Sequence, residues 1–102
     1  MKIIEKKKIY TAAKKSLIEA SKDSAINFNS KIDKIILLGD GSLIDSIAFV
    51  NFIVGTEDYI KKETKKDISI KIDKIHSINK GKKKLIFIDF VNALFKLLNE
   101  KE

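Results

Sequence analysis

Apolar residues recur at intervals of three and four along the first twenty positions of the chain, a spacing typical of one face of a helix. Lysines fill most of the opposite face. The pattern predicts an amphipathic helix over residues 2–20, ended by the polar cluster at 21–24. Its apolar face consists of Ile9, Tyr10, Ala13, Leu17 and Ala20.

This periodicity is lost between Ala25 and Leu43, where scattered apolar residues stand among asparagines and serines. We expect a long loop with apolar anchor points. The sequence Gly-Asp-Gly-Ser at 39–42 predicts a turn near its end, because glycine and aspartate favour tight turns. Structureless loops of this length are uncommon inside compact domains unless they serve a function.

Helical spacing returns after the loop. Asp45 and Ser46 are both residue types that cap helix N-termini, so a second long helix is predicted from there through Ile60, ended by the lysines at 61, 62, 65 and 66. A third is predicted from about Phe87, with Asp89 in its first turn, where a carboxylate complements the helix dipole. Its apolar face consists of Phe90, Val91, Leu94, Phe95 and Leu98.

The region between these two helices has mixed patterns. Isoleucine at every second position from Ile68 to Ile72 predicts a five-residue strand, for which no partner strand is evident. Ile75 and Ile78 keep a spacing of three and predict one short helical turn. The lysines and glycine from Lys80 to Lys84 predict a flexible basic loop.

Together these elements predict an all-α fold, a bundle of three main helices plus one short helix, with the long loop between helices 1 and 2. The chain has 102 residues, of which 44% are hydrophobic, so it can bury a core of its own. No internal repeat or composition break divides it. A single domain over residues 1–102 is therefore predicted.

The composition excludes several kinds of chemistry. Without cysteine there is no disulfide, thiolate metal site or cysteine nucleophile, and a single histidine leaves little for zinc or serine–histidine catalysis. We therefore predict no metal site, no catalytic residues and no enzyme activity. The longest apolar runs have four residues, against the roughly 20 needed to cross a bilayer, so a soluble cytoplasmic protein without membrane insertion is expected.

The net charge is strongly positive. The chain has 21 lysines and no arginine against 14 acidic residues, which gives +7. A basic balance raises nucleic acids or acidic surfaces as partners, but lysine without arginine or tryptophan is a diffuse signal. We interpret most of the lysines as a solvated surface, and a nucleic-acid partner is not the favoured prediction.

The second helix has two apolar faces when residues are placed at about 100° per step. A helix buried on all sides is unusual in so small a chain, so the second face predicts a docking surface for other proteins. The alternative is a central helix that is simply buried. The predicted core face consists of Phe49, Phe52, Ile53 and Ile60. The second face, called the docking face below, consists of Ile47, Val50 and Val54, flanked by Asn51, Glu57 and Asp58.

The tripeptide Asp45-Ser46-Ile47 at the start of this helix is similar to a motif of a known protein family. Asp45, Ser46 and Ile47 follow a glycine-containing loop, and Glu57 stands eleven positions after the serine. This arrangement resembles the acyl carrier protein family, whose members share a loop ending in Asp-Ser-Leu or a close variant, a helix that begins at the serine, and an acid at that distance. The loop similar to that of free-standing carriers comprises Leu38, Gly39, Gly41, Ser42, Leu43 and Ile44.

The resemblance implies that Ser46 is esterified with 4'-phosphopantetheine, whose thiol holds an acyl or aminoacyl group as a thioester. It also implies three partners: a phosphopantetheinyl transferase, a ligase or synthase that activates the acid, and an acyltransferase, in fatty acid or secondary metabolite biosynthesis. Asp45 is then either the neighbour that the transferase recognises or the helix cap. The physical setting fits, because the first residue of a helix lies beside unpaired N–H groups that favour a phosphodiester.

The chain also departs from this family. Its carriers are usually acidic, whereas this chain is basic, and Asn51 stands where an acid is usual. Ser42 also precedes a leucine, but the residue eleven positions after it is Ile53, so Ser46 is the predicted attachment site. Two alternatives remain: a small basic helical module that binds nucleic acid through lysine–phosphate contacts, and a carrier-like interaction domain without the modification.

Overall fold

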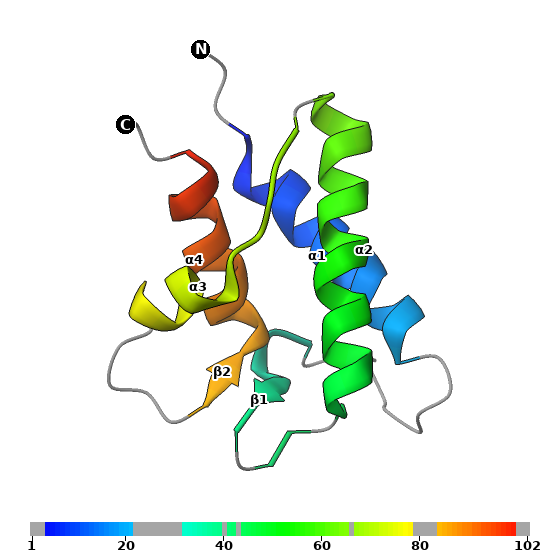
Figure 1. Ribbon diagram of the computed structural model, residues 1–102, viewed down its shortest axis with the longest axis vertical. Helices are drawn as coiled ribbons and strands as arrows, with labels where there is room; N and C mark the ends of the chain where they lie inside the picture. Colours follow the sequence, from blue (N-terminus) through cyan, green and yellow to red (C-terminus); the bar gives the residue numbers. More distant parts are fainter. Residues whose placement is uncertain are drawn as a thin grey trace.

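The computed structural model of the chain describes residues 4–21, 32–39, 41–42, 44–65, 67–78 and 84–99, without the side chains of residues 76 and 78. Figure 1 shows the arrangement of the elements. The predictions for residues 2–3, 22–31, 40, 43, 66 and 80–83 lie outside the described residues. The elements in chain order are α1 (Lys6–Ala20), η1 (Ile32–Lys34), β1 (Ile36–Leu38), α2 (Ser46–Thr64), α3 (Ile72–Ile78), β2 (Leu85–Ile86) and α4 (Phe87–Leu98).

Three long helices and one short helix confirm the predicted helical framework. The predicted starts of α2 and α4 are confirmed as well. The end of α2 is later than predicted, because Lys61 and Lys62 lie in its last turn. The helix ends at Thr64, and the C-cap residue Lys65 adopts a left-handed conformation with φ 57°. Lysine near a helix C-terminus interacts favourably with the helix dipole, so these lysines mark the last turn rather than a stop.

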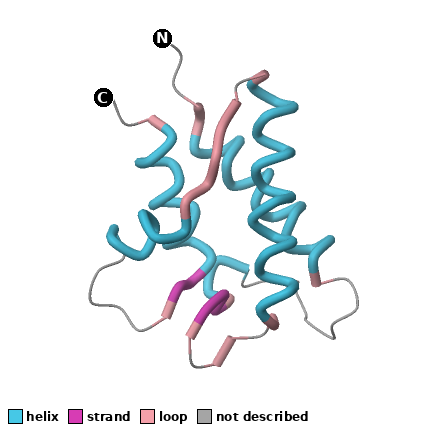
Figure 2. Tube along the Cα trace, viewed as in Figure 1, coloured by secondary structure: helices cyan, strands magenta, loops and turns pink. Residues whose placement is uncertain are grey.

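The all-α prediction is wrong in one respect, because the fold contains a two-stranded antiparallel sheet (Figure 2). β1 lies inside the segment predicted as a loop, and β2 directly precedes α4. Ile36 pairs with Ile86 and Leu38 with Leu85, with an irregularity between the two pairs. The Phe87 amide also donates to the Ile35 carbonyl at 2.8 Å, so the segment leading to α2 is joined to the first residue of α4.

The strand predicted from Ile68 to Ile72 is wrong. No strand is formed there, and Ile72 is already the first residue of α3. The alternating pattern reflects alternating burial, since Ile70 is buried while its neighbours Ser69 and Lys71 are exposed. The Ile70 amide donates to the Glu57 carboxylate at 2.5 Å, a bond that replaces the missing strand partner.

Helices α1 and α2 run in opposite directions and cross, with α1 behind α2 in Figure 1. At the crossing, the buried Ser16 hydroxyl donates to the Phe52 carbonyl at 2.6 Å. A Cβ atom at Gly55 would lie 2.3 Å from the Ser16 oxygen, which is far inside van der Waals contact. Glycine at position 55 is therefore what lets the two backbones approach.

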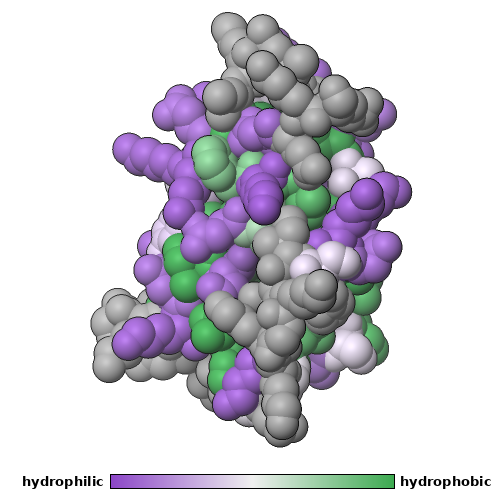
Figure 3. Space-filling model, turned by 90° about the vertical axis from the view of Figure 1, so that its left-hand side faces the viewer, coloured by the Kyte–Doolittle hydropathy of each residue, from purple (hydrophilic) through white to green (hydrophobic). Residues whose placement is uncertain are grey.

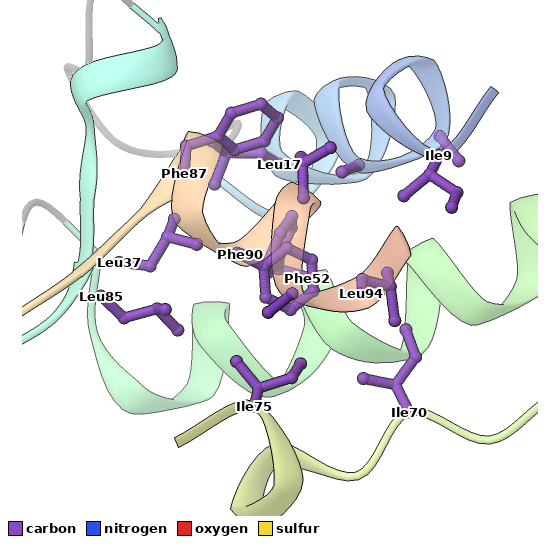
Figure 4. Packing of buried hydrophobic residues seen from close by; sticks show 14 of the residues in the cluster. Ile9, Leu17, Leu37, Phe52, Ile70, Ile75, Leu85, Phe87, Phe90 and Leu94 are labelled. Carbon is purple, nitrogen blue, oxygen red and sulfur yellow. The ribbon is translucent and has the colours of Figure 1, made fainter. Parts of the chain in front are cut away.

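The core lies between α1, α2 and α4, with Phe52 near its centre (Figure 4). The Phe52 ring is fully buried, 4.9 Å from the Phe90 ring and 6.4 Å from the Phe87 ring, measured between centroids. Leu37 of β1 and Ile75 of α3 cover the remaining sides. On the side of α3 and α4, hydrophobic residues reach the surface as separate areas between hydrophilic ones (Figure 3).

Candidate functional site

The candidate site is built on the first turn of α2. Asp45 is the N-cap, with an extended backbone (φ −85°, ψ 177°), and Ser46 is the first helical residue. The Asp45 carboxylate accepts the Ala48 amide at 2.7 Å, and its carbonyl accepts the Phe49 amide at 2.9 Å. Of the two roles considered for Asp45, the cap is therefore confirmed.

Ser46 is exposed, and its hydroxyl has no hydrogen-bond partner among the residues that the structure describes. In the same part of the chain, the amides of Ser46 and Ile47 also have no acceptor. Free amides at a helix N-terminus, together with the positive end of the helix dipole, favour an anion. A phosphate ester on Ser46 would lie beside these two groups.

Ser42 is held differently. Its hydroxyl lies 2.9 Å from the carbonyl oxygens of both Leu37 and Ile44, and its amide donates to the Gly39 carbonyl at 3.2 Å. Gly41 has φ 86°, a backbone conformation that residues with a side chain rarely adopt. The Ser42 hydroxyl is thus part of the turn before α2, so of the two candidate serines only Ser46 has a hydroxyl without a partner among the described residues.

The apolar part of the docking face is exposed along the N-terminal half of α2. Side-chain exposure is 73% for Ile47, 57% for Val50 and 49% for Val54. The opposite face is buried, as predicted for Phe49, Phe52 and Ile60, although Ile53 is only half-buried. The prediction that α2 has two distinct apolar faces is therefore confirmed, and the docking role of the exposed one stays a prediction.

The polar residues of the docking face divide into two groups. Asn51 and Asp58 are exposed, whereas Glu57 is half-buried and its carboxylate accepts the Ile70 amide. The predicted rim acid thus holds the segment before α3, a role that its position in the sequence does not reveal. No lysine occurs between residues 44 and 60, so this stretch of the basic chain contributes only acidic charges, those of Asp45, Glu57 and Asp58.

The described residues form neither a metal site nor a membrane-spanning helix. Within those ranges, no group of three or more histidine, cysteine or acidic side chains lies close enough together to hold a metal ion. Likewise, none of the described helices has the length and apolar character needed to cross a membrane.

The structure brings Asp45, Ser46 and the exposed apolar residues of the docking face together on the first half of α2. Glu57 stands apart from them because it is bound to Ile70. Comparisons of the chain with protein-family models, with curated proteins and with solved structures found no match.

Proposed function

We propose that the chain is a carrier protein of the acyl carrier protein type. Ser46 bears 4'-phosphopantetheine, and the thiol of that group holds an acyl or aminoacyl cargo as a thioester for presentation to partner enzymes. The observation that supports this most strongly is the position of Ser46: an exposed, unpaired hydroxyl on the first residue of a long helix.

The residues around Ser46 fit this role chemically. The amides of Ser46 and Ile47 and the helix dipole favour the negative charge of a phosphodiester. Asp45 uses one carboxylate oxygen to cap the helix, so the helix start is fixed without any contribution from the Ser46 hydroxyl. Thiol chemistry comes from the prosthetic group, so the absence of cysteine is compatible with a carrier.

The docking face supports the same proposal. An enzyme that acts on the Ser46 arm has to rest on the surface next to it, and Val50 lies one helical turn from the serine. The exposed apolar residues there can be buried against a partner protein. Asp58 adds a negative charge to this surface, although the chain as a whole is positively charged.

The proposal is tested by the intact mass of the protein after co-expression with phosphopantetheinyl transferases of different specificity. The protein should gain the mass of one phosphopantetheine group. The Ser46→Ala variant should gain nothing, whereas Ser42→Ala should still be modified. An unmodified protein with every transferase, or a gain that persists in Ser46→Ala, would contradict the proposed function.

A second prediction concerns the docking face. Val50→Glu should lower the kcat/KM of Ser46 modification by about tenfold, because a charge replaces an exposed apolar contact of the kind that dominates binding energy. Ile18→Glu is the matched control, since Ile18 is an apolar residue of α1 with a comparable exposure of 42%. Equal effects of the two substitutions would show that the docking face has no special role. Glu57 is unsuitable for this test because it also binds Ile70.

A further inference from the structure

A groove lies between α1 and α2, on the side of their crossing where the first half of α1 faces the last turns of α2. Its volume is about 460 Å³, within the range of roughly 300–1,000 Å³ typical of small-molecule sites. The lysines that line it, called the groove lysines below, are Lys7, Lys8, Lys15 and Lys62.

The groove lysines lack the partners that surface lysines often have. None of them has a carboxylate oxygen within 4.0 Å among the described residues, although Glu5 and Glu63 also line the groove. Four positive and two negative side chains leave a local excess of positive charge. Like charges held at the walls of one concave surface repel one another, and a bound anion relieves that repulsion.

The wall contributed by α2 includes an aromatic ring in a fixed position. Tyr59 is half-buried, and its hydroxyl donates to the Glu19 carboxylate of α1. This hydrogen bond raises the pKa of Tyr59, and the Glu19 carboxylate that accepts it places a negative charge beside the Tyr59 wall of the groove. The Lys15 ammonium lies over the Tyr59 ring, 5.9 Å from its centre, a cation–π contact that holds this lysine at the wall of the groove.

From these contacts we infer that the groove between α1 and α2 binds a compact polyphosphate, either inorganic or as the phosphate chain of a nucleotide. Four exposed lysines that line one concave site suit a ligand with several closely spaced negative charges. A long nucleic acid suits it less, because the four lysines line one groove of about 460 Å³ rather than an extended surface. The groove is separate from Ser46, which lies at the other end of α2.

The inference is tested by calorimetric titration of the full chain with inorganic triphosphate and with ATP at about 0.15 M salt. Both should bind saturably with one-to-one stoichiometry. Tighter binding of ATP that is lost in Tyr59→Leu would identify a nucleotide, and equal binding of the two would identify the phosphate chain alone as the ligand. No saturable binding of either compound would overturn the inference.

Matched charge variants separate a site from diffuse attraction. Lys15→Gln/Lys62→Gln should weaken binding at least about tenfold, because charge-assisted hydrogen bonds to phosphate are lost. Lys71→Gln/Lys74→Gln removes the same charge from exposed positions at α3 and should leave the affinity within about twofold. Equal weakening by the two double variants would overturn the inference, as would a short DNA duplex that displaces triphosphate and binds more tightly.

The proposed carrier function is tested separately. The Ser46→Ala variant should bind triphosphate as the unaltered chain does, because no groove residue belongs to the first turn of α2. Circular dichroism of each lysine variant checks that the fold is kept. Intact mass reports on the carrier function and calorimetry on triphosphate binding. Failure of one proposal is therefore distinguished from failure of the other.

Discussion

Replacing Phe52 by alanine should lower the free energy of unfolding by about 3–5 kcal/mol, a large part of the roughly 5–15 kcal/mol typical of a domain. Phe52 is fully buried, and its ring centroid lies within 6.4 Å of the centroids of three other phenylalanine rings. Truncation removes these contacts and leaves a cavity at the junction of α1, α2 and α4. Urea unfolding followed by circular dichroism measures the loss.

Val54→Ala is the matched control, because Val54 lies on the same helix but is 49% exposed. It should change the stability by no more than about 0.5 kcal/mol. If Phe52→Ala does not fold at all, Phe52→Leu should still fold with a smaller loss. Similar losses for Phe52→Ala and Val54→Ala would contradict the assignment of the two faces of α2.

The second large effect concerns the crossing of α1 and α2. Alanine normally stabilises a helix relative to glycine by about 1 kcal/mol, yet Gly55→Ala should destabilise this protein by about 1–3 kcal/mol. The added methyl carbon would lie 2.3 Å from the Ser16 oxygen, so either the helices separate or the Ser16 hydroxyl rotates away from the Phe52 carbonyl.

A double-mutant cycle identifies the cause. Ser16→Ala alone should cost about 0.5–1.5 kcal/mol, the value of one hydrogen bond. In the Ser16→Ala background, Gly55→Ala should be neutral or slightly stabilising, because the clashing oxygen is gone and the nearest remaining atom, the Cβ at position 16, is 3.3 Å away. If Gly55→Ala costs the same in both backgrounds, contact with the Ser16 hydroxyl is not the reason for glycine.

Local signals in the sequence were sufficient for the starts of α2 and α4 and for the two faces of α2, but not for the start of α1, which begins at Lys6 and not at residue 2. The apolar spacing after Phe87 and the capping residue types at 45 and 46 depend on neighbours within one or two turns, and the structure confirms both helix starts. The exposure of Ile47 and Val50 also followed from helical geometry, because a residue opposite to Phe52 cannot share its environment.

Features that depend on distant pairing could not be predicted in this way. β1 and β2 have three and two residues and are more than forty positions apart, so neither shows a strand pattern of its own. The groove lysines resemble solvated residues in the sequence, since their proximity to Tyr59 arises only when α1 crosses α2. The Glu57 bond to Ile70 likewise depends on how the chain returns after α2.

The short sheet and the Ser42 turn have a consequence for any enzyme that modifies Ser46. Before Ser46, Ile36 is paired to Ile86, the Ser42 hydroxyl closes the turn and Asp45 caps α2. After it, the buried face of α2 is anchored by Phe52. The described residues on both sides of Ser46 are thus held in place, so an enzyme of the proposed kind gives up little conformational entropy in ordering them.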